Sequence, residues 1–147
     1  MKHSRSIFLA IFILLTAVQC FAHHLAVVVD KSNNVGNISS GHLTKILRSE
    51  VKKWPDGKNI VLVLHKNLSE ENLTLQRLTN MSAAELKTLF AAHKDSILTV
   101  DSDSGVIKAV ESMPGAIGLV EVHSVDEGIN VVKVDGKLPM EDGYLPH

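Results

Sequence analysis

The sequence predicts an α/β fold, a three-layer sandwich with a mainly parallel or mixed sheet of about five strands. Apolar, β-branched runs of strand length alternate with amphipathic segments of helical period along most of the chain. The chain has 147 residues, of which 45% are hydrophobic, and this is enough apolar material for one core. We therefore expect helices on both faces of a single sheet.

Five runs rich in apolar residues have the length of strands, and the first two have the pattern of buried strands. The five runs are residues 25–29, 59–64, 97–100, 116–120 and 130–134. Polar and turn-forming residues bound these runs, such as the Trp-Pro-Asp-Gly turn at 54–57. These runs supply the five strands of the expected sheet.

Four helices are expected between or beside these strands. Leu43, Ile46 and Leu47 recur at helical spacing, and Ser82 with Glu85 has the spacing of a capping box. Side chains that can cap the four helix starts are Ser39 or Ser40, Ser69, Ser82 and Ser102.

The first 22 residues are predicted to be a signal peptide, followed by one domain at 23–147. A basic start precedes an apolar run at 7–18, which is shorter than the roughly 20 residues that span a bilayer. Cys20 and Ala22 stand at the −3 and −1 positions of a cleavage site. We expect a periplasmic protein; an uncleaved anchor and a lipid on Cys20 are the alternatives.

Composition argues against several functions. The 15 basic and 16 acidic residues nearly balance and aromatics make up 4%, so nucleic acid is not an expected partner. The sequence holds no nucleophile elbow, phosphate-binding loop or zinc-protease motif, so we expect no enzyme and no cofactor. His23 and His24 would follow the cleavage site and could chelate copper, but incidental histidines are the expectation, with no metal site.

Three loops follow strands and precede helices, where ligands bind in parallel sheets. They are residues 30–40, 65–72 and 101–105. Each loop also has a purely structural explanation, namely a polar turn, a solvated lysine beside a helix cap, or a helix cap alone. Candidate ligand-binding residues in these loops are Ser32, Asn33, Lys66, Ser69, Ser102, Ser104 and Gly105.

Five segments occur in an order and spacing that resemble a known family. They are Asp-Lys-Ser-Asn at 30–33, the segment 51–57 that ends in Trp-Pro-Asp-Gly, the strand at 60–64, Met-Ser-Ala-Ala-Glu-Leu-Lys at 81–87, and Pro-Gly-Ala-Ile-Gly-Leu-Val at 114–120. Together they resemble the PstS-type phosphate-binding proteins of phosphate ABC transporters and their short periplasmic relatives. The resemblance covers nearly all of the chain after residue 22.

The resemblance implies a type II periplasmic binding-protein fold. Full-length members hold phosphate between two lobes, with a serine and an aspartate from the first lobe. They add an arginine and a Ser-Gly-Thr-type loop after the strand that corresponds to residues 60–64. Here that loop has neither, and Lys66 and Ser69 are the nearest replacements. We expect the first lobe to be absent or reduced.

Two functions follow from these expectations. The first is a periplasmic solute-binding domain for phosphate or a related small oxyanion, serving an ABC transporter permease or a sensor protein. The alternative is a protein-interaction module that keeps the fold, has lost the ligand site, and binds a partner or a second copy of the chain. Changing Lys66 and Ser69 should abolish anion binding in the first case and leave partner binding intact in the second.

Overall fold

The computed structural model describes residues 24–66 and 69–146, so the predicted signal peptide and His23 lie outside the described residues. Four helices are α1 (Ser40–Leu47), α2 (Ser69–Thr79), α3 (Ala83–Ala92) and α4 (Asp103–Ser112), and a short 3-10 helix covers Val122–Ser124. Six strands are β1 (Leu25–Asp30), β2 (Asn37–Ile38), β3 (Val61–His65), β4 (Ile97–Val100), β5 (Ala116–Glu121) and β6 (Ile129–Val134).

The strands form one mixed sheet in the order β2-β6-β1-β5-β3-β4. β3 pairs in parallel with β4 and β5, and β2 pairs in parallel with β6. β1 alone runs against its two neighbours, β5 and β6. The predicted α/β class is confirmed. The sheet has six strands instead of about five, because the two-residue β2 is too short to leave a pattern in the sequence.

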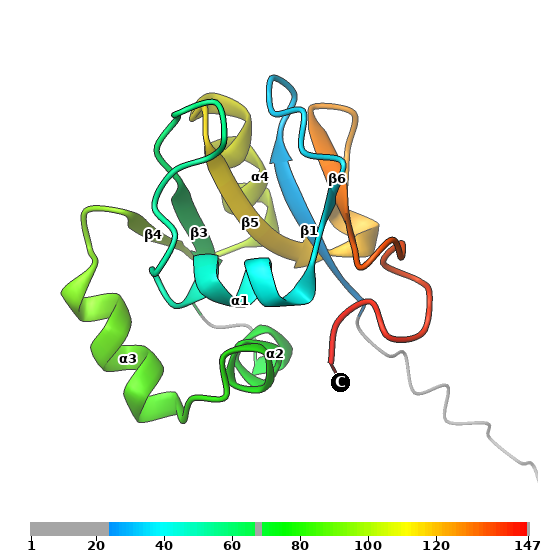
Figure 1. The fold of residues 1–147 in the computed structure, drawn as a ribbon. Coiled ribbons are helices and arrows are strands. Elements are labelled where there is room, and N and C mark those ends of the chain that lie inside the picture. Colours follow the sequence, from blue (N-terminus) through cyan, green and yellow to red (C-terminus); the bar gives the residue numbers. More distant parts are fainter. Residues whose placement is uncertain (1–23, 67–68, 147) are drawn as a thin grey trace, which may run out of the picture.

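Helices cover both faces of this sheet, with α4 on one side and α1 on the other (Figure 1). Alternate side chains of β1 supply the two cores. Val27 and Val29 belong to the cluster that includes Leu43 of α1, whereas Val28 belongs to the cluster that includes Val106 of α4. This is the expected three-layer arrangement.

The predicted helix starts are confirmed where their side chains are described. The Ser39 hydroxyl accepts a hydrogen bond from the His42 N–H, and Ser82 and Glu85 form the reciprocal bonds of a capping box. The Ser102 hydroxyl accepts from the Gly105 N–H in the same way. No helix within the described ranges combines the length and apolar character needed to cross a membrane.

The direction of β1 corrects the expectation that three loops share one edge of the sheet. Because β1 is antiparallel to β5, the loop after β1 lies beside the segments that enter β3 and β5. The Gly115 N–H, just before β5, donates to Asp30 Oδ1 at 3.2 Å. The loops at 65–72 and 101–105 follow the parallel pair β3 and β4 at the opposite edge.

Four of the five segments that carry the family resemblance meet at Gly115, which belongs to the last of them. Its N–H binds Asp30, and its carbonyl accepts from Trp54 Nε1 at 2.9 Å and from the Val61 N–H at 3.2 Å. Gly115 has a φ of +88°, and a Cβ there would lie 2.1 Å from the Asn59 carbonyl oxygen. Only glycine fits this position. These segments therefore stabilise the fold, and they do so at the edge of the sheet opposite to the carboxyl ends of β3 and β4.

The C-terminal segment is fixed by Tyr144. The Tyr144 hydroxyl donates to the Val132 carbonyl at 2.6 Å and accepts from the Val27 N–H at 3.0 Å. It thus joins β1 and β6, and burial raises the pKa of this hydroxyl to about 12.

Candidate functional site

The carboxyl ends of β3 and β4 bring two of the predicted loops together. The Lys66 N–H donates to the Val100 carbonyl at 2.8 Å. His65 Nε2 lies 2.9 Å from the Asp101 carbonyl oxygen, and His65 Nδ1 lies 3.3 Å from Asp103 Oδ1. The imidazole of His65 therefore bridges the end of β3 and the first turn of α4.

Asp103 anchors this edge to the end of β5. Its Oδ2 accepts from the Glu121 N–H at 3.0 Å and from the Ser124 hydroxyl at 2.8 Å. The carboxylate thus contacts three different elements through His65, Glu121 and Ser124. These contacts join the end of β3, the start of α4 and the end of β5.

Glu71, in the first turn of α2, is buried beside this network. Its side chain is 1% exposed, and its Oε1 accepts from the His65 N–H at 3.2 Å. Its Oε2 has no hydrogen-bond partner among the described residues. Burial, together with the nearby negative charge of Asp103, raises the pKa of Glu71 to about 8, against a smaller lowering by the His65 N–H. The carboxyl group is therefore largely protonated and neutral at pH 7.

A cavity of about 750 Å³ opens between the ends of β3 and β4 and the α2–α3 pair. We call it the β3–α3 cavity. Two lysines, Lys66 and Lys87, line it, and neither ammonium group forms an ion pair with another described side chain. Its further lining residues are Leu64, His65, Glu71, Asn72, Leu73, Leu75, Gln76, Ala83, Leu86, Phe90 and Thr99.

The predicted residues of this edge fall into two groups. Lys66 is exposed and lines the cavity, and Ser69 is the first residue of α2. Ser102, Ser104 and Gly105 belong to the start of α4 and are not among the lining residues. The Ser102 hydroxyl is used as the cap of α4, in agreement with the structural explanation of this loop.

Ser32 and Asn33 lie at the other edge of the sheet, away from Lys66. The Ser32 hydroxyl donates to Asp30 Oδ2, and Asn33 Oδ1 accepts from the Val35 N–H at 3.0 Å. These bonds are those of a polar turn. The structure therefore does not bring Ser32 and Asn33 together with the other candidates.

Lys66 is the one lining residue that was among the predicted candidates; Glu71 and Lys87, which set the charge of the cavity with it, were not. Glu71 precedes Leu75 by four residues and so shares its buried face of α2, a signal that was present in the sequence. Lys87 follows the core residue Leu86 on α3 and gave no such signal. Its place in the cavity depends on how α3 packs against α2.

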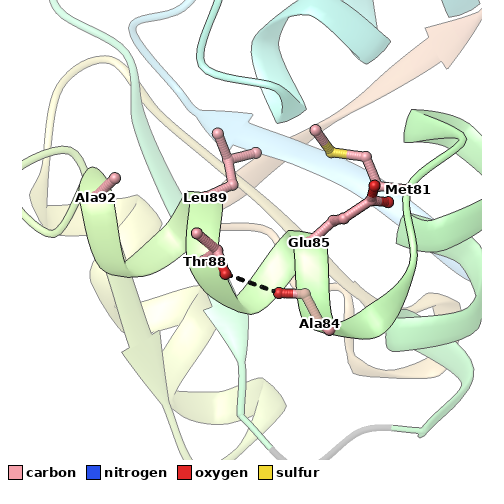
Figure 2. A pocket seen from close by; sticks show the side chains of 6 residues that line it. All are labelled: Met81, Ala84, Glu85, Thr88, Leu89 and Ala92. Carbon is pink, nitrogen blue, oxygen red and sulfur yellow. Dashed lines mark hydrogen bonds between the residues drawn. The ribbon is translucent and has the colours of Figure 1, made fainter.

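A second cavity, of about 530 Å³, lies on the other face of α3 and is a weaker candidate. Figure 2 shows its lining side chains, which include Glu85, Thr88 and Leu89. Glu85 is engaged in the capping box, and the Thr88 hydroxyl donates to the Ala84 carbonyl at 3.1 Å. Both polar side chains are thus used within the helix. In the part of the chain that the structure describes, no group of three or more His, Cys, Asp and Glu could hold a metal ion.

The fold is that of a periplasmic-binding-protein-like domain. The family model of the PBP superfamily domain matches residues 15–144. The chain therefore belongs to this superfamily. No curated protein matches the chain at a significant level.

Solved structures of phosphate-binding proteins share this fold. An ABC-type phosphate transport receptor from Vibrio cholerae matches with a TM-score of 0.64 and 19% identity, over 80% of this chain and 48% of that one. A putative phosphate ABC transporter substrate-binding protein with bound phosphate from Clostridium perfringens gives 0.66 and 22%, over 79% and 46%. PstS from Borrelia burgdorferi gives 0.60 and 21%, over 80% and 49%. These structures share the fold that the resemblance implies, and the chain spans about half the length of these proteins.

Proposed function

We propose that this chain is a solute-binding domain that holds phosphate or a related small oxyanion in the β3–α3 cavity. The charge of the cavity carries the proposal. Lys66 and Lys87 are positive at pH 7, whereas burial raises the pKa of Glu71 to about 8 and leaves that carboxyl group mostly neutral. A bound anion therefore meets two ammonium groups that form no ion pair with another described side chain, and little opposing charge from Glu71.

Donors from α2 support the same proposal. The helix begins at Ser69, and the N–H groups of its first turn have no partners within the helix. Such groups, together with the helix dipole, favour an anion at a helix start. The amide side chains of Asn72 and Gln76 line the cavity and add neutral donors. The proposed function is reversible binding, with no chemical step.

The family supports a role in transport or sensing. The solved relatives are described as a phosphate transport receptor and as a substrate-binding protein of a phosphate ABC transporter. We therefore propose that an ABC transporter permease or a sensor protein is the partner that binds the ligand-loaded protein. We propose the periplasm as the compartment in which this occurs. Association of the chain with a second copy stays a prediction.

Calorimetric titration of the purified protein with phosphate at low ionic strength tests the proposal, with sulfate titrated beside it. We expect saturable binding of phosphate, weakened at least tenfold in the double variant Lys66→Gln/Lys87→Gln. The matched control is Lys94→Gln/Lys108→Gln, which removes two exposed lysines outside the cavity. This control should bind phosphate as the unchanged protein does.

Two results would contradict the proposal. Equal weakening in both double variants would mean that phosphate responds only to net charge. No heat of binding at millimolar phosphate would exclude the anion site. It would favour the alternative function, a protein-interaction module, and the same variants would then be tested for binding to a protein partner.

A further inference from the structure

The size of the β3–α3 cavity exceeds what a small inorganic anion fills. Its volume of about 750 Å³ lies within the range of roughly 300–1,000 Å³ that is typical of pockets for drug-sized organic ligands. Phosphate alone would leave most of this space to water. The space therefore accommodates a ligand that has an uncharged organic part, its body, as well as a charged group.

The walls of the cavity are suited to an apolar body. Leu64, Leu75, Leu86 and Phe90 line it from β3, α2 and α3. Leu73 also lines it, and its side chain is 51% exposed although it is a large apolar residue. An apolar ligand surface packed there would remove this leucine from water.

Polar groups are concentrated at the end of β3 and the start of α2. Lys66 directly follows β3, and Glu71 and Asn72 lie in the first turn of α2, whereas α3 contributes Lys87 as its one charged lining residue. Glu71 Oε2 is buried and has no partner among the described residues. Buried polar atoms in native proteins usually have a hydrogen-bond partner, and the charged group of a ligand can supply it.

We propose that the ligand of the β3–α3 cavity is an organic anion, with a phosphate or carboxylate group at Lys66 and Lys87 and an apolar body against Leu73 and Phe90. The inference rests on the proposed function, because that function places the anion at the two lysines. It goes further by assigning the substrate class. The anionic group provides charge recognition, and the apolar body provides most of the affinity.

The test compares four ligands by calorimetry on the purified protein, below their critical micelle concentrations. They are inorganic phosphate, octyl phosphate, octanoate and 1-octanol. Each methylene transferred from water contributes about a fourfold gain in affinity. With about half of the octyl chain buried, we expect octyl phosphate or octanoate to bind on the order of a hundredfold more tightly than inorganic phosphate. We expect 1-octanol to bind at least tenfold more weakly than the better of the two anions.

Two variants separate the apolar body from the charged group. Leu73→Gln should reduce the ratio of octyl phosphate affinity to phosphate affinity at least threefold. Leu98→Gln is the matched control, because Leu98 is 39% exposed on β4 and does not line the cavity. It should leave the ratio unchanged. Lys66→Gln/Lys87→Gln should weaken both octyl phosphate and inorganic phosphate.

The outcomes distinguish this inference from the proposed function. If inorganic phosphate binds as tightly as octyl phosphate and octanoate, the inference is overturned and the anion-binding function stands. If 1-octanol binds as tightly as the two organic anions, the charged group does not contribute to binding. Both the inference and the proposed anion-binding function then fail. Binding of none of the four ligands would also overturn both. If the two organic anions differ, the tighter one identifies the charged group.

Discussion

The backbone N–H of His65 donates to Oε1 of Glu71 at 3.2 Å, and this bond joins the last residue of β3 to the first turn of α2. It holds the Glu71 carboxyl group inside the protein, where burial disfavours its charged form. The same bond fixes the backbone beside Lys66 at the entrance to α2. Glu71 therefore links the stability of the fold to the charge of the β3–α3 cavity.

Stability should fall with pH because of Glu71. Its pKa is about 8 in the folded protein and close to 4.5 in an unfolded chain, so the folded state binds the proton more tightly. Unfolding between these pH values releases that proton, and raising the pH therefore favours unfolding. Glu71→Gln removes this effect. We expect its free energy of unfolding, relative to the unchanged protein, to rise by up to about 1.4 kcal/mol per pH unit between pH 5 and 8.

Urea unfolding at pH 5, 6, 7 and 8 measures this difference. Glu127→Gln is the control, because Glu127 is exposed and its substitution should leave the pH dependence as it is. Parallel stability curves for Glu71→Gln and the unchanged protein would show that Glu71 titrates as an ordinary surface carboxylate.

Tyr144→Phe should destabilise the protein by about 1–3 kcal/mol. The substitution keeps the ring and removes the hydroxyl that bridges the Val27 N–H and the Val132 carbonyl, which leaves both buried groups without this partner. Urea unfolding at pH 7 measures the loss. Met140→Leu changes an exposed side chain of the same segment and should be neutral. A neutral Tyr144→Phe would mean that the tail does not brace β1 against β6.

Gly118→Ala should cost about 1–3 kcal/mol through overpacking. A Cβ at this position of β5 would lie 2.6 Å from Cγ1 of Val106 on α4 and 3.3 Å from the Val63 carbonyl oxygen. Gly118→Ala/Val106→Ala removes the closest of these contacts, so it should be more stable than the sum of the two single losses predicts. Strictly additive losses in urea unfolding would show that α4 does not lie this close to β5. Gly41→Ala, with open space around its Cβ in α1, is the control and should not destabilise.

Local patterns in the sequence were enough to predict most elements of the fold. Runs rich in apolar residues marked five strands, and Ser39, Ser82 and Ser102 marked helix starts, because these signals depend only on near neighbours in the chain. The direction of β1 was not predictable in this way. A strand buried on both faces has the same pattern in either direction, and its direction depends on distant pairing with β5 and β6.

The candidate site was predictable only in part for the same reason. Lys66 was found because it follows a strand at the sheet edge where parallel strands end. Ser32 was grouped with it on the assumption that β1 ran in the same direction, and the structure places it at the other edge. Lys87 enters the cavity through the packing of α3 on α2, which no local pattern encodes.

Mapping of amide chemical shifts during a phosphate titration tests the central claim most directly. In two-dimensional NMR spectra of isotope-labelled protein at pH 7, we expect progressive, saturable shifts at Lys66, Glu71, Asn72 and Lys87. The amides of Ser32 and Asn33 at the opposite edge should stay in place. Shifts confined to Ser32 and Asn33, or no saturable shift at the cavity, would contradict the assignment of the β3–α3 cavity as the ligand site.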